Sequence, residues 1–283
     1  MDALAFIGGS EAADALIKEH PHPHRLKVFL QLEGKNLGII LPDADLETAA
    51  EQITIGSMSF NGQRCTAIKL VFVHSSMAQD FLSKFVPKID ALKIGLPWIE
   101  GVQITPLPEP KKPEYLIALI KDAIAKNATL VNKKSGGGTM AGRIMRPAVV
   151  FPVTRNMRLW EEEQFGPVVP VAVYDDIQEI YDYIKETRYG QQASVFTTSS
   201  KSAAPLIDIL STAVGRININ TQCGRSPDSL PFSGRRSSAM GTMSIQESLN
   251  LFSTETLVAG KDSDSNREIA HGLDEQTKFL QAF

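Results

Sequence analysis

The sequence predicts an α/β fold in which helices cover a largely parallel β-sheet. Three observations support this prediction. Short apolar runs, typical of buried strands, alternate with helical patterns of about 10 to 15 residues, as β-α-β units do. Phe81, Phe85 and Ile89 recur every four residues, which indicates the buried face of a helix. Asp43 and Asp45 are both candidate caps just before another helical pattern.

The elements follow this alternation along the chain. We expect strands at 26–32 and 37–42, and then a helix that begins at Asp43 or Asp45. Further strands are expected at 69–75, 128–132, 166–175, 191–198 and 215–220, and helices at 77–91, 113–127, 177–188 and 202–212. Two segments rich in glycine and proline, 95–113 and 221–242, are interpreted as loops, and the length of the second favours a functional role. The tail from Lys261 is polar and then weakly helical.

The composition indicates a globular protein whose partner is a small molecule or another subunit. Of 283 residues, 43% are hydrophobic and 22% charged, which allows one large domain or two smaller ones. A net charge of -3 with interleaved signs favours neither nucleic acid nor membrane, and no apolar run approaches the roughly 20 residues that span a bilayer. Two distant cysteines and no secretory signal favour the reducing cytoplasm. The prolines in "HPHPH" at 20–24 predict an extended, solvated loop and no metal site.

A glycine turn near the N-terminus is the first candidate binding element. "LAFIGGSEAADALIKEH" is typical of a strand, a turn at Gly8 and Gly9, and an amphipathic helix capped by Ser10. A helix N-terminus presents free N–H groups and a positive dipole end, so this turn can hold a phosphate. An ordinary strand-to-helix turn remains the alternative, because the adjacent glycines do not form a GxGxxG pattern.

Cys65 is the candidate nucleophile. A free thiol with a pKa of about 8.5 is mostly protonated at neutral pH and needs cationic or dipolar help to react. Arg64 adjoins it, and the backbone amides of the turn from Gly62 to Thr66 can stabilise a thiolate or an oxyanion. A structural role remains open from these residues alone. Cys223, in the long polar loop, is the second thiol and is interpreted as structural or incidental.

Several ordered motifs resemble the aldehyde dehydrogenase superfamily. "FNGQRCTAIKLVFV" is similar to its active-cysteine segment, and "FIGGS" to its cofactor-phosphate turn. "LQLEGKNLGIILPDADLE", "EEEQFGPVVPV", "YGQQASVFT", "GRININ" and "LPFSGRRSSAMGT" extend the match almost to the tail. "FNGQRCTAIK", "QCGRSPD" and "PFSGRRSSAMGTMS" most resemble the NADP-dependent, non-phosphorylating glyceraldehyde-3-phosphate branch.

The resemblance implies a fold and a reaction. It implies a three-layer α/β/α catalytic domain with remnants of a Rossmann-like cofactor domain. Cys65 would attack a phosphorylated aldehyde, form a thioester during hydride transfer to NADP or NAD, and release an acid with water. Glu163 and Phe165 match residues at the nicotinamide ribose, and Gly8 and Gly9 match the diphosphate turn.

The phosphate-aldehyde branch also implies cations at the substrate mouth. Arg64 and Arg225 resemble two such residues, and a guanidinium suits a pair of phosphate oxygens. A solvated loop charge remains the alternative for Arg225. Asn61 lies in the approach to Cys65 and receives no role.

One departure from the family concerns deacylation. Aligned on Gly34 and Lys35, the family's general-base glutamate falls on Gln31, whose amide cannot accept the proton of the deacylating water. Glu33 would replace it only if the strand register shifted by two residues. Relatives without this glutamate include acylating enzymes that use coenzyme A, so a CoA-acylating semialdehyde dehydrogenase stays open as an alternative.

A second departure concerns the start of the chain. In a full family member most of the cofactor domain, with the asparagine of the oxyanion hole, precedes the "FIGGS" turn. We therefore expect the end of a cofactor domain at 1–31, a catalytic domain at 32–225, a return and oligomerisation segment at 226–261 and a polar tail at 262–283. The expected partners are copies of the chain in a homo-oligomer, or a complementing N-terminal portion. An inactive fragment or pseudoenzyme that acts only in assembly is a further alternative.

Overall fold

The computed structural model describes residues 1–278, which form two compact units. The first unit runs from Met1 to Leu251, and the second begins at Phe252. The second unit contains α9 (Asp264–Gln276), which agrees with the expected helical pattern in the tail. Within residues 1–278 no helix is long and apolar enough to cross a membrane. The four domain boundaries expected from the sequence remain predictions.

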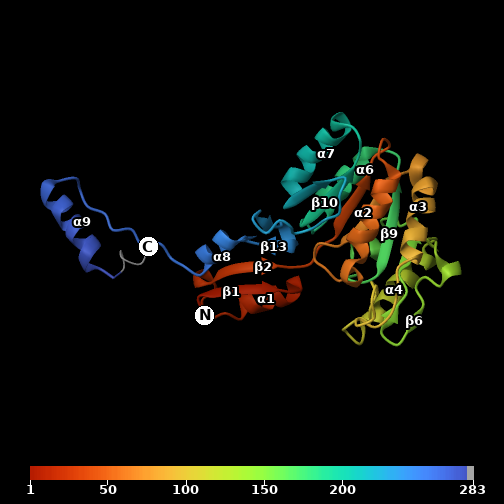
Figure 1. Ribbon diagram of the computed structural model, residues 1–283, viewed down its shortest axis with the longest axis horizontal. Helices are drawn as coiled ribbons and strands as arrows, with labels where there is room; N and C mark the ends of the chain where they lie inside the picture. Colours follow the sequence, from red (N-terminus) through yellow and green to blue (C-terminus); the bar gives the residue numbers. More distant parts are fainter. Residues whose placement is uncertain (279–283) are drawn as a thin grey trace. The chain divides into compact units, whose positions relative to one another are not determined.

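A seven-stranded sheet forms the centre of the first unit (Figure 1). Its order is β11-β10-β3-β4-β9-β8-β5, and all neighbours run parallel except β5, which is antiparallel to β8. The strands are β3 (Asn36–Ile40), β4 (Ile68–His74), β5 (Thr129–Leu130), β8 (Ala148–Phe151), β9 (Val168–Tyr174), β10 (Gln192–Phe196) and β11 (Arg216–Ile219). The predicted α/β class with a largely parallel sheet is confirmed.

Helices cover both faces of this sheet, as the alternating side chains of β4 require. Leu70 and Phe72 pack in one apolar cluster with α6 (Ile177–Glu186) and α7 (Ser200–Ala213). Val71 and Val73 pack on the opposite face with α2 (Leu46–Met58) and α3 (Ala78–Asp90). Because both faces are buried, β4 is apolar from Leu70 to Val73 instead of alternating with polar residues. The result is the expected three-layer arrangement.

The start of α2 shows how the sequence sets a helix boundary. The carboxylate of Asp45 accepts the N–H of Thr48 at 2.6 Å, so Asp45 and not Asp43 caps α2. Two further helices of the first unit are α4 (Lys112–Ala125) and the short α5 (Arg158–Glu161). Both contribute to an apolar cluster that includes residues of β8.

A second, smaller sheet is built by the N-terminal residues. β1 (Ala3–Ile7) pairs in parallel with β2 (Lys27–Gln31), and β13 (Ala239–Met240) pairs antiparallel to β2. α1 (Ser10–Lys18) packs beside it, with α8 (Ile245–Leu251) nearby (Figure 1). Residues 32–35 run from β2 to β3 and so join the two sheets.

Several expectations were wrong in detail. Gly9, not Ser10, is the N-cap of α1, because the Ser10 hydroxyl donates to Glu33 instead of to a backbone group of its own helix. The strand expected at 128–132 is reduced to β5, and β8 lies in a segment for which no strand was predicted. The last two residues of "HPHPH", Pro23 and His24, form an exposed 3₁₀ turn with Arg25, where an extended loop was expected. The two expected loops, 95–113 and 221–242, contain only short helical and strand segments. The short strands not yet named are β6 (Met140–Ala141), β7 (Ile144–Met145), β12 (Phe232–Ser233) and β14 (Thr242–Met243).

Candidate active site

A strained turn after α2 delivers Cys65 to the junction of the two sheets. Phe60, Asn61 and Gly62 all have positive φ angles, of 55°, 62° and 69°. A Cβ atom on Gly62 would lie 2.7 Å from the carbonyl oxygens of Ser57 and Gly166, so only glycine fits at this position. Asn61 is buried and bonds Thr105 through both ends of its amide, which fixes the turn to the loop that follows α3.

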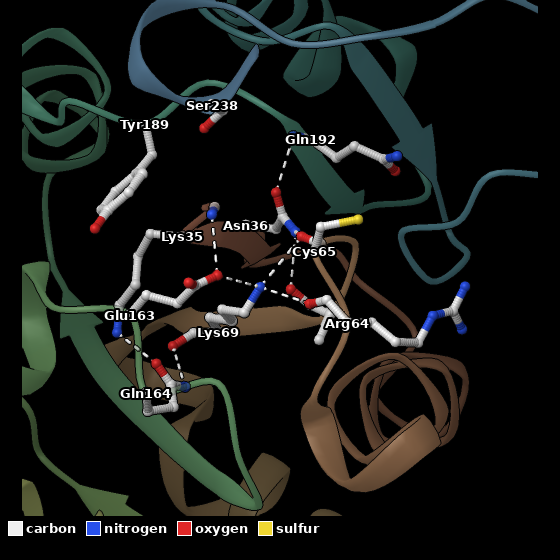
Figure 2. A network of polar contacts seen from close by, with 12 residues as sticks. Lys35, Asn36, Arg64, Cys65, Lys69, Glu163, Gln164, Tyr189, Gln192 and Ser238 are labelled. Carbon is white, nitrogen blue, oxygen red and sulfur yellow. Dashed lines mark hydrogen bonds and ion pairs between the residues drawn. The ribbon is translucent and has the colours of Figure 1, made fainter. Parts of the chain in front are cut away.

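Two buried side chains hold the backbone of Cys65 (Figure 2). The Asn36 amide donates to the Cys65 carbonyl oxygen at 2.6 Å, and its own oxygen accepts the N–H of Gln192 at 2.9 Å. Lys69 Nζ donates to the carbonyl oxygens of Arg64 at 2.7 Å and Cys65 at 3.1 Å. Both carbonyls that flank the thiol-bearing residue are therefore fixed from the side of the central sheet.

Glu163 is tied to the same group of residues. Its Oε1 lies 2.9 Å from Lys69 Nζ and accepts the N–H of Gly34 at 3.0 Å. The Lys69 side chain is 1% exposed and that of Glu163 12%, so this is a largely buried ion pair. The contacts described for Glu163 use Oε1, which leaves Oε2 available to a ligand.

A second buried lysine lies beside this pair. Lys35 Nζ donates to Glu162 O at 2.6 Å and to Gln164 Oε1 at 2.7 Å. Burial lowers the pKa of Lys35 to about 7, and the nearby charge of Lys69 acts in the same direction, although Glu163 opposes it. The sequence analysis assigned Lys35, Asn36 and Lys69 no role at the site. A lysine inside an apolar strand was the available signal for Lys69, because buried charges are generally paired.

One cavity of about 880 Å³ is lined by all eight residues that the sequence suggested for the site. These residues are Gly8, Gly9, Gln31, Arg64, Cys65, Glu163, Phe165 and Arg225. They come from the smaller sheet, the turn after α2, the segment before β9 and the long loop after β11. The cavity also borders residues that the sequence did not suggest, among them Lys112, Tyr115, Arg188 and Tyr189. The roles of the eight residues suggested from the sequence remain predictions, but the fold does bring these residues together around one cavity.

Gln31 and Glu33 differ sharply within this cavity. Gln31 is 1% exposed, and neither atom of its amide has a hydrogen-bond partner among residues 1–278. Its place at the end of β2 is fixed by pairing with Ile7 and Ala239, so no register shift brings Glu33 into that position. Glu33 instead accepts the Ser10 hydroxyl at 2.6 Å.

The two arginines that the sequence suggested, Arg64 and Arg225, are partly engaged. The Arg64 guanidinium lies 5.2 Å from the centre of the Phe60 ring. Arg225 lies 5.5 Å from the centre of the Phe232 ring, and its Nε is 3.1 Å from Asp228 Oδ1. Both side chains retain exposure, which a binding role requires.

The two thiols have different surroundings. Cys65 is partly exposed and borders the cavity. Cys223 is 1% exposed, its sulfur lies 3.2 Å from Ser194 Oγ, and burial raises its pKa to about 11. Cys223 is therefore protonated at neutral pH and belongs to the apolar core, as its structural interpretation expected.

Comparison with known proteins places this geometry in a family. The sequence model described as "Aldehyde dehydrogenase family" matches residues 1–258. The chain belongs to the aldehyde dehydrogenase family. The NADP-dependent glyceraldehyde-3-phosphate dehydrogenase of Streptococcus equinus is 36% identical over 227 residues, which are 80% of this chain and 46% of that protein. The enzyme of the same name from Arabidopsis thaliana is 32% identical over 251 residues, 89% of this chain and 48% of the relative.

Solved aldehyde dehydrogenase structures give the same picture. The crystal structure of NADP-dependent glyceraldehyde-3-phosphate dehydrogenase from Bacillus halodurans C-125, complexed with NADP, matches with a TM-score of 0.82 and 35% identity. The match covers 88% of this chain and 50% of that one. This aldehyde dehydrogenase chain thus spans about half the length of the relatives it matches.

The cavity is large enough for a small-molecule ligand. Its volume of about 880 Å³ lies in the range of small-molecule sites, roughly 300 to 1,000 Å³. Glu163, with Oε2 available, and Phe165 border the same space as Cys65. Gly8 and Gly9, which lead into α1, border the same cavity.

Proposed function

We propose that this chain carries the cysteine chemistry of an NADP-linked aldehyde dehydrogenase acting on glyceraldehyde 3-phosphate and yielding 3-phosphoglycerate. The single observation that carries the proposal is the shared cavity of Cys65, Glu163, Phe165 and the Gly8–Gly9 turn. The family membership and the names of the relatives with 32% to 36% identity support the same reaction. A homo-oligomer, or a complementing N-terminal portion, is the partner that we propose.

The covalent step belongs to Cys65. Its thiolate adds to the aldehyde carbon and gives the oxyanion of a thiohemiacetal, and loss of a hydride from that carbon leaves a neutral thioester on the sulfur. Bound NADP, or NAD, would supply the hydride acceptor. Lys69 and Asn36 keep the Cys65 backbone in place through its carbonyl oxygen, while Glu163 Oε2 and Phe165 would hold the nicotinamide ribose.

The substrate phosphate is assigned to Arg64 and Arg225. Both border the cavity that contains Cys65, and both side chains are partly exposed. A guanidinium offers paired N–H donors that match two phosphate oxygens. Lys112, which also borders the cavity and lies 5.5 Å from the Phe165 ring centre, adds a third positive charge.

Gln31 favours a second candidate for the release step. A general base contributes about 10² to 10⁴ in rate, and the buried Gln31 amide cannot take the proton of an attacking water. A thioester that water does not resolve quickly can be transferred to a thiol acceptor. A CoA-acylating semialdehyde dehydrogenase is therefore the alternative that this residue supports.

Product analysis separates these candidates. The chain is incubated with glyceraldehyde 3-phosphate and NADP, with and without coenzyme A, beside a Cys65→Ser control. Formation of 3-phosphoglycerate without coenzyme A supports the leading proposal, and product only with coenzyme A supports the acylating alternative. If neither product forms and Cys65 carries no acyl group, both enzyme proposals fail and an inactive assembly fragment remains.

A further inference from the structure

Glu33 occupies the turn that the cofactor diphosphate would use. Ser10 Oγ donates to Glu33 Oε2 at 2.6 Å. A Cβ atom built on Gly9 would lie 3.2 Å from Glu33 Oε1, so the carboxylate covers the glycine itself. The side chain thus reaches from the end of β2 to the Gly9–Ser10 turn.

The surroundings suit an anion at this place. α1 is nine residues long, begins at Ser10 and has no side-chain cap, so its first N–H groups and positive dipole end face the turn. The Glu33 carboxylate, which accepts the Ser10 hydroxyl, places a negative charge beside this end of the helix. A phosphate would use the same donors, namely the Ser10 hydroxyl and the helix N-terminus.

A second feature of the cavity points to a polar ligand. Gln31, two residues before Glu33, is 1% exposed and has no partner among residues 1–278 for either atom of its amide. Buried polar groups are normally hydrogen-bonded, so this amide at the wall of the cavity has hydrogen-bonding capacity left for a water or a ligand atom. The walls that hold Glu33 and Gln31 are continuous with the surface that borders Cys65.

We propose that Glu33 is an internal competitor for the dinucleotide diphosphate and that it sets the affinity of this chain for NADP or NAD. The inference rests on the proposed cofactor site at Gly8 and Gly9. A carboxylate and a diphosphate at the Ser10 hydroxyl repel each other because both are negative, and this repulsion lowers the affinity for the dinucleotide. The diphosphate therefore binds only when Glu33 leaves the turn.

Binding measurements on the whole chain test this inference without any aldehyde. NADP dissociation constants are measured by isothermal titration for the wild type, Glu33→Gln and Glu33→Ala. Glu33→Gln removes the charge and keeps the side-chain length, whereas Glu33→Ala clears the turn. We expect both variants to bind NADP about tenfold or more tightly than the wild type, and inorganic pyrophosphate to show the same direction.

A matched control separates local competition from the net charge of the cavity. Glu109 borders the same cavity but is bonded by Gln63 at 3.0 Å, and Glu109→Gln removes the same charge away from the turn. It should leave NADP affinity within about twofold of the wild type. A urea unfolding curve for each variant verifies that the chain is folded.

The outcomes are distinct from those of the proposed function. Equal or weaker NADP binding by Glu33→Gln, no measurable binding by either Glu33 variant, or an equal gain in Glu109→Gln overturns the inference, whatever the aldehyde assays give. Conversely, tighter NADP binding in both Glu33 variants with no acylation of Cys65 supports the inference while the proposed reaction fails.

Discussion

Lys69 and Glu163 form an ion pair of 2.9 Å directly behind the thiol-bearing turn, and Lys69 also donates to the carbonyl oxygen of Cys65. One side chain therefore connects the proposed nucleophile to the proposed ribose ligand. The pair lies on the central sheet, because Lys69 belongs to β4 and Glu163 precedes β9, the neighbour of β4. A displacement of the Glu163 carboxylate would therefore shift Lys69 and, through it, the backbone of Cys65.

Replacing Lys69 should destabilise the fold strongly. Lys69→Met removes the cation that pairs with the Glu163 carboxylate and one donor to each of two backbone carbonyls, and loss of one member of a buried pair costs about 3 to 5 kcal/mol. Urea unfolding measures the difference. The control is Lys88→Met, which removes the exposed pair of Lys88 with Glu47 at 2.6 Å and should change stability little. Equal losses of unfolding free energy in the two variants would show that the buried pair stabilises the fold no more than the exposed pair does.

The two cysteines should react differently in the native chain. Cys65 borders the cavity, whereas the Cys223 thiol is buried and its pKa is raised to about 11, so iodoacetamide at pH 7 should modify Cys65 alone. Peptide mapping by mass spectrometry identifies the modified residue. In Cys65→Ser, native labelling should vanish and return only in denaturant. Rapid native modification of Cys223 would contradict the buried position of this thiol.

Lys35 should give the chain a distinctive dependence of stability on pH. Its pKa is lowered by burial to about 7 in the folded state from an ordinary value of 10.5, so between these values the unfolded chain binds more protons. The free energy of unfolding therefore gains about 1.4 kcal/mol per pH unit from this group as the pH rises above 7, and this contribution is absent below pH 7.

The Lys35→Met variant isolates that contribution. Unfolding free energies of wild type and variant are measured in urea at pH 6, 7, 8 and 9, and the difference between them is plotted, because titrations common to both chains cancel. We expect the wild type to gain on the variant from pH 7 to 9. A difference that stays flat, or that shrinks as the pH rises, would rule out a neutral Lys35 in the folded chain.

The sequence predicted the layered fold well because its signals are local. Apolar runs such as that of β4 and the four-residue spacing of Phe81, Phe85 and Ile89 report burial directly, and all three of these α3 side chains are buried. β8 was missed because four apolar residues between prolines carry no periodicity that separates a strand from a loop. β13, only two residues long, exists because it pairs with β2, more than 200 residues earlier.

The site was predictable only in part for the same reason. Motif resemblance suggested residues that the fold brings to one cavity, Cys65 and Glu163 among them. The partners that hold them were missed, since the contact of Asn36 with Cys65 depends on the packing of β3 against the turn after α2. The bond between Ser10 and Glu33 was missed because the first residue of a helix and a residue in the segment after a strand carry no mutual signal in the sequence.

The central claim is that Cys65 forms an acyl-enzyme that Gln31 is poorly suited to resolve. Intact-protein mass spectrometry after mixing the chain with glyceraldehyde 3-phosphate and NADP tests it most directly, with wild type, Gln31→Glu and Cys65→Ser compared over time. The account predicts a persistent acyl adduct on Cys65 in the wild type, none in Cys65→Ser, and decay about 10² to 10⁴ times faster in Gln31→Glu. Absence of any adduct on Cys65, or equal adduct lifetimes in the wild type and Gln31→Glu, would contradict it.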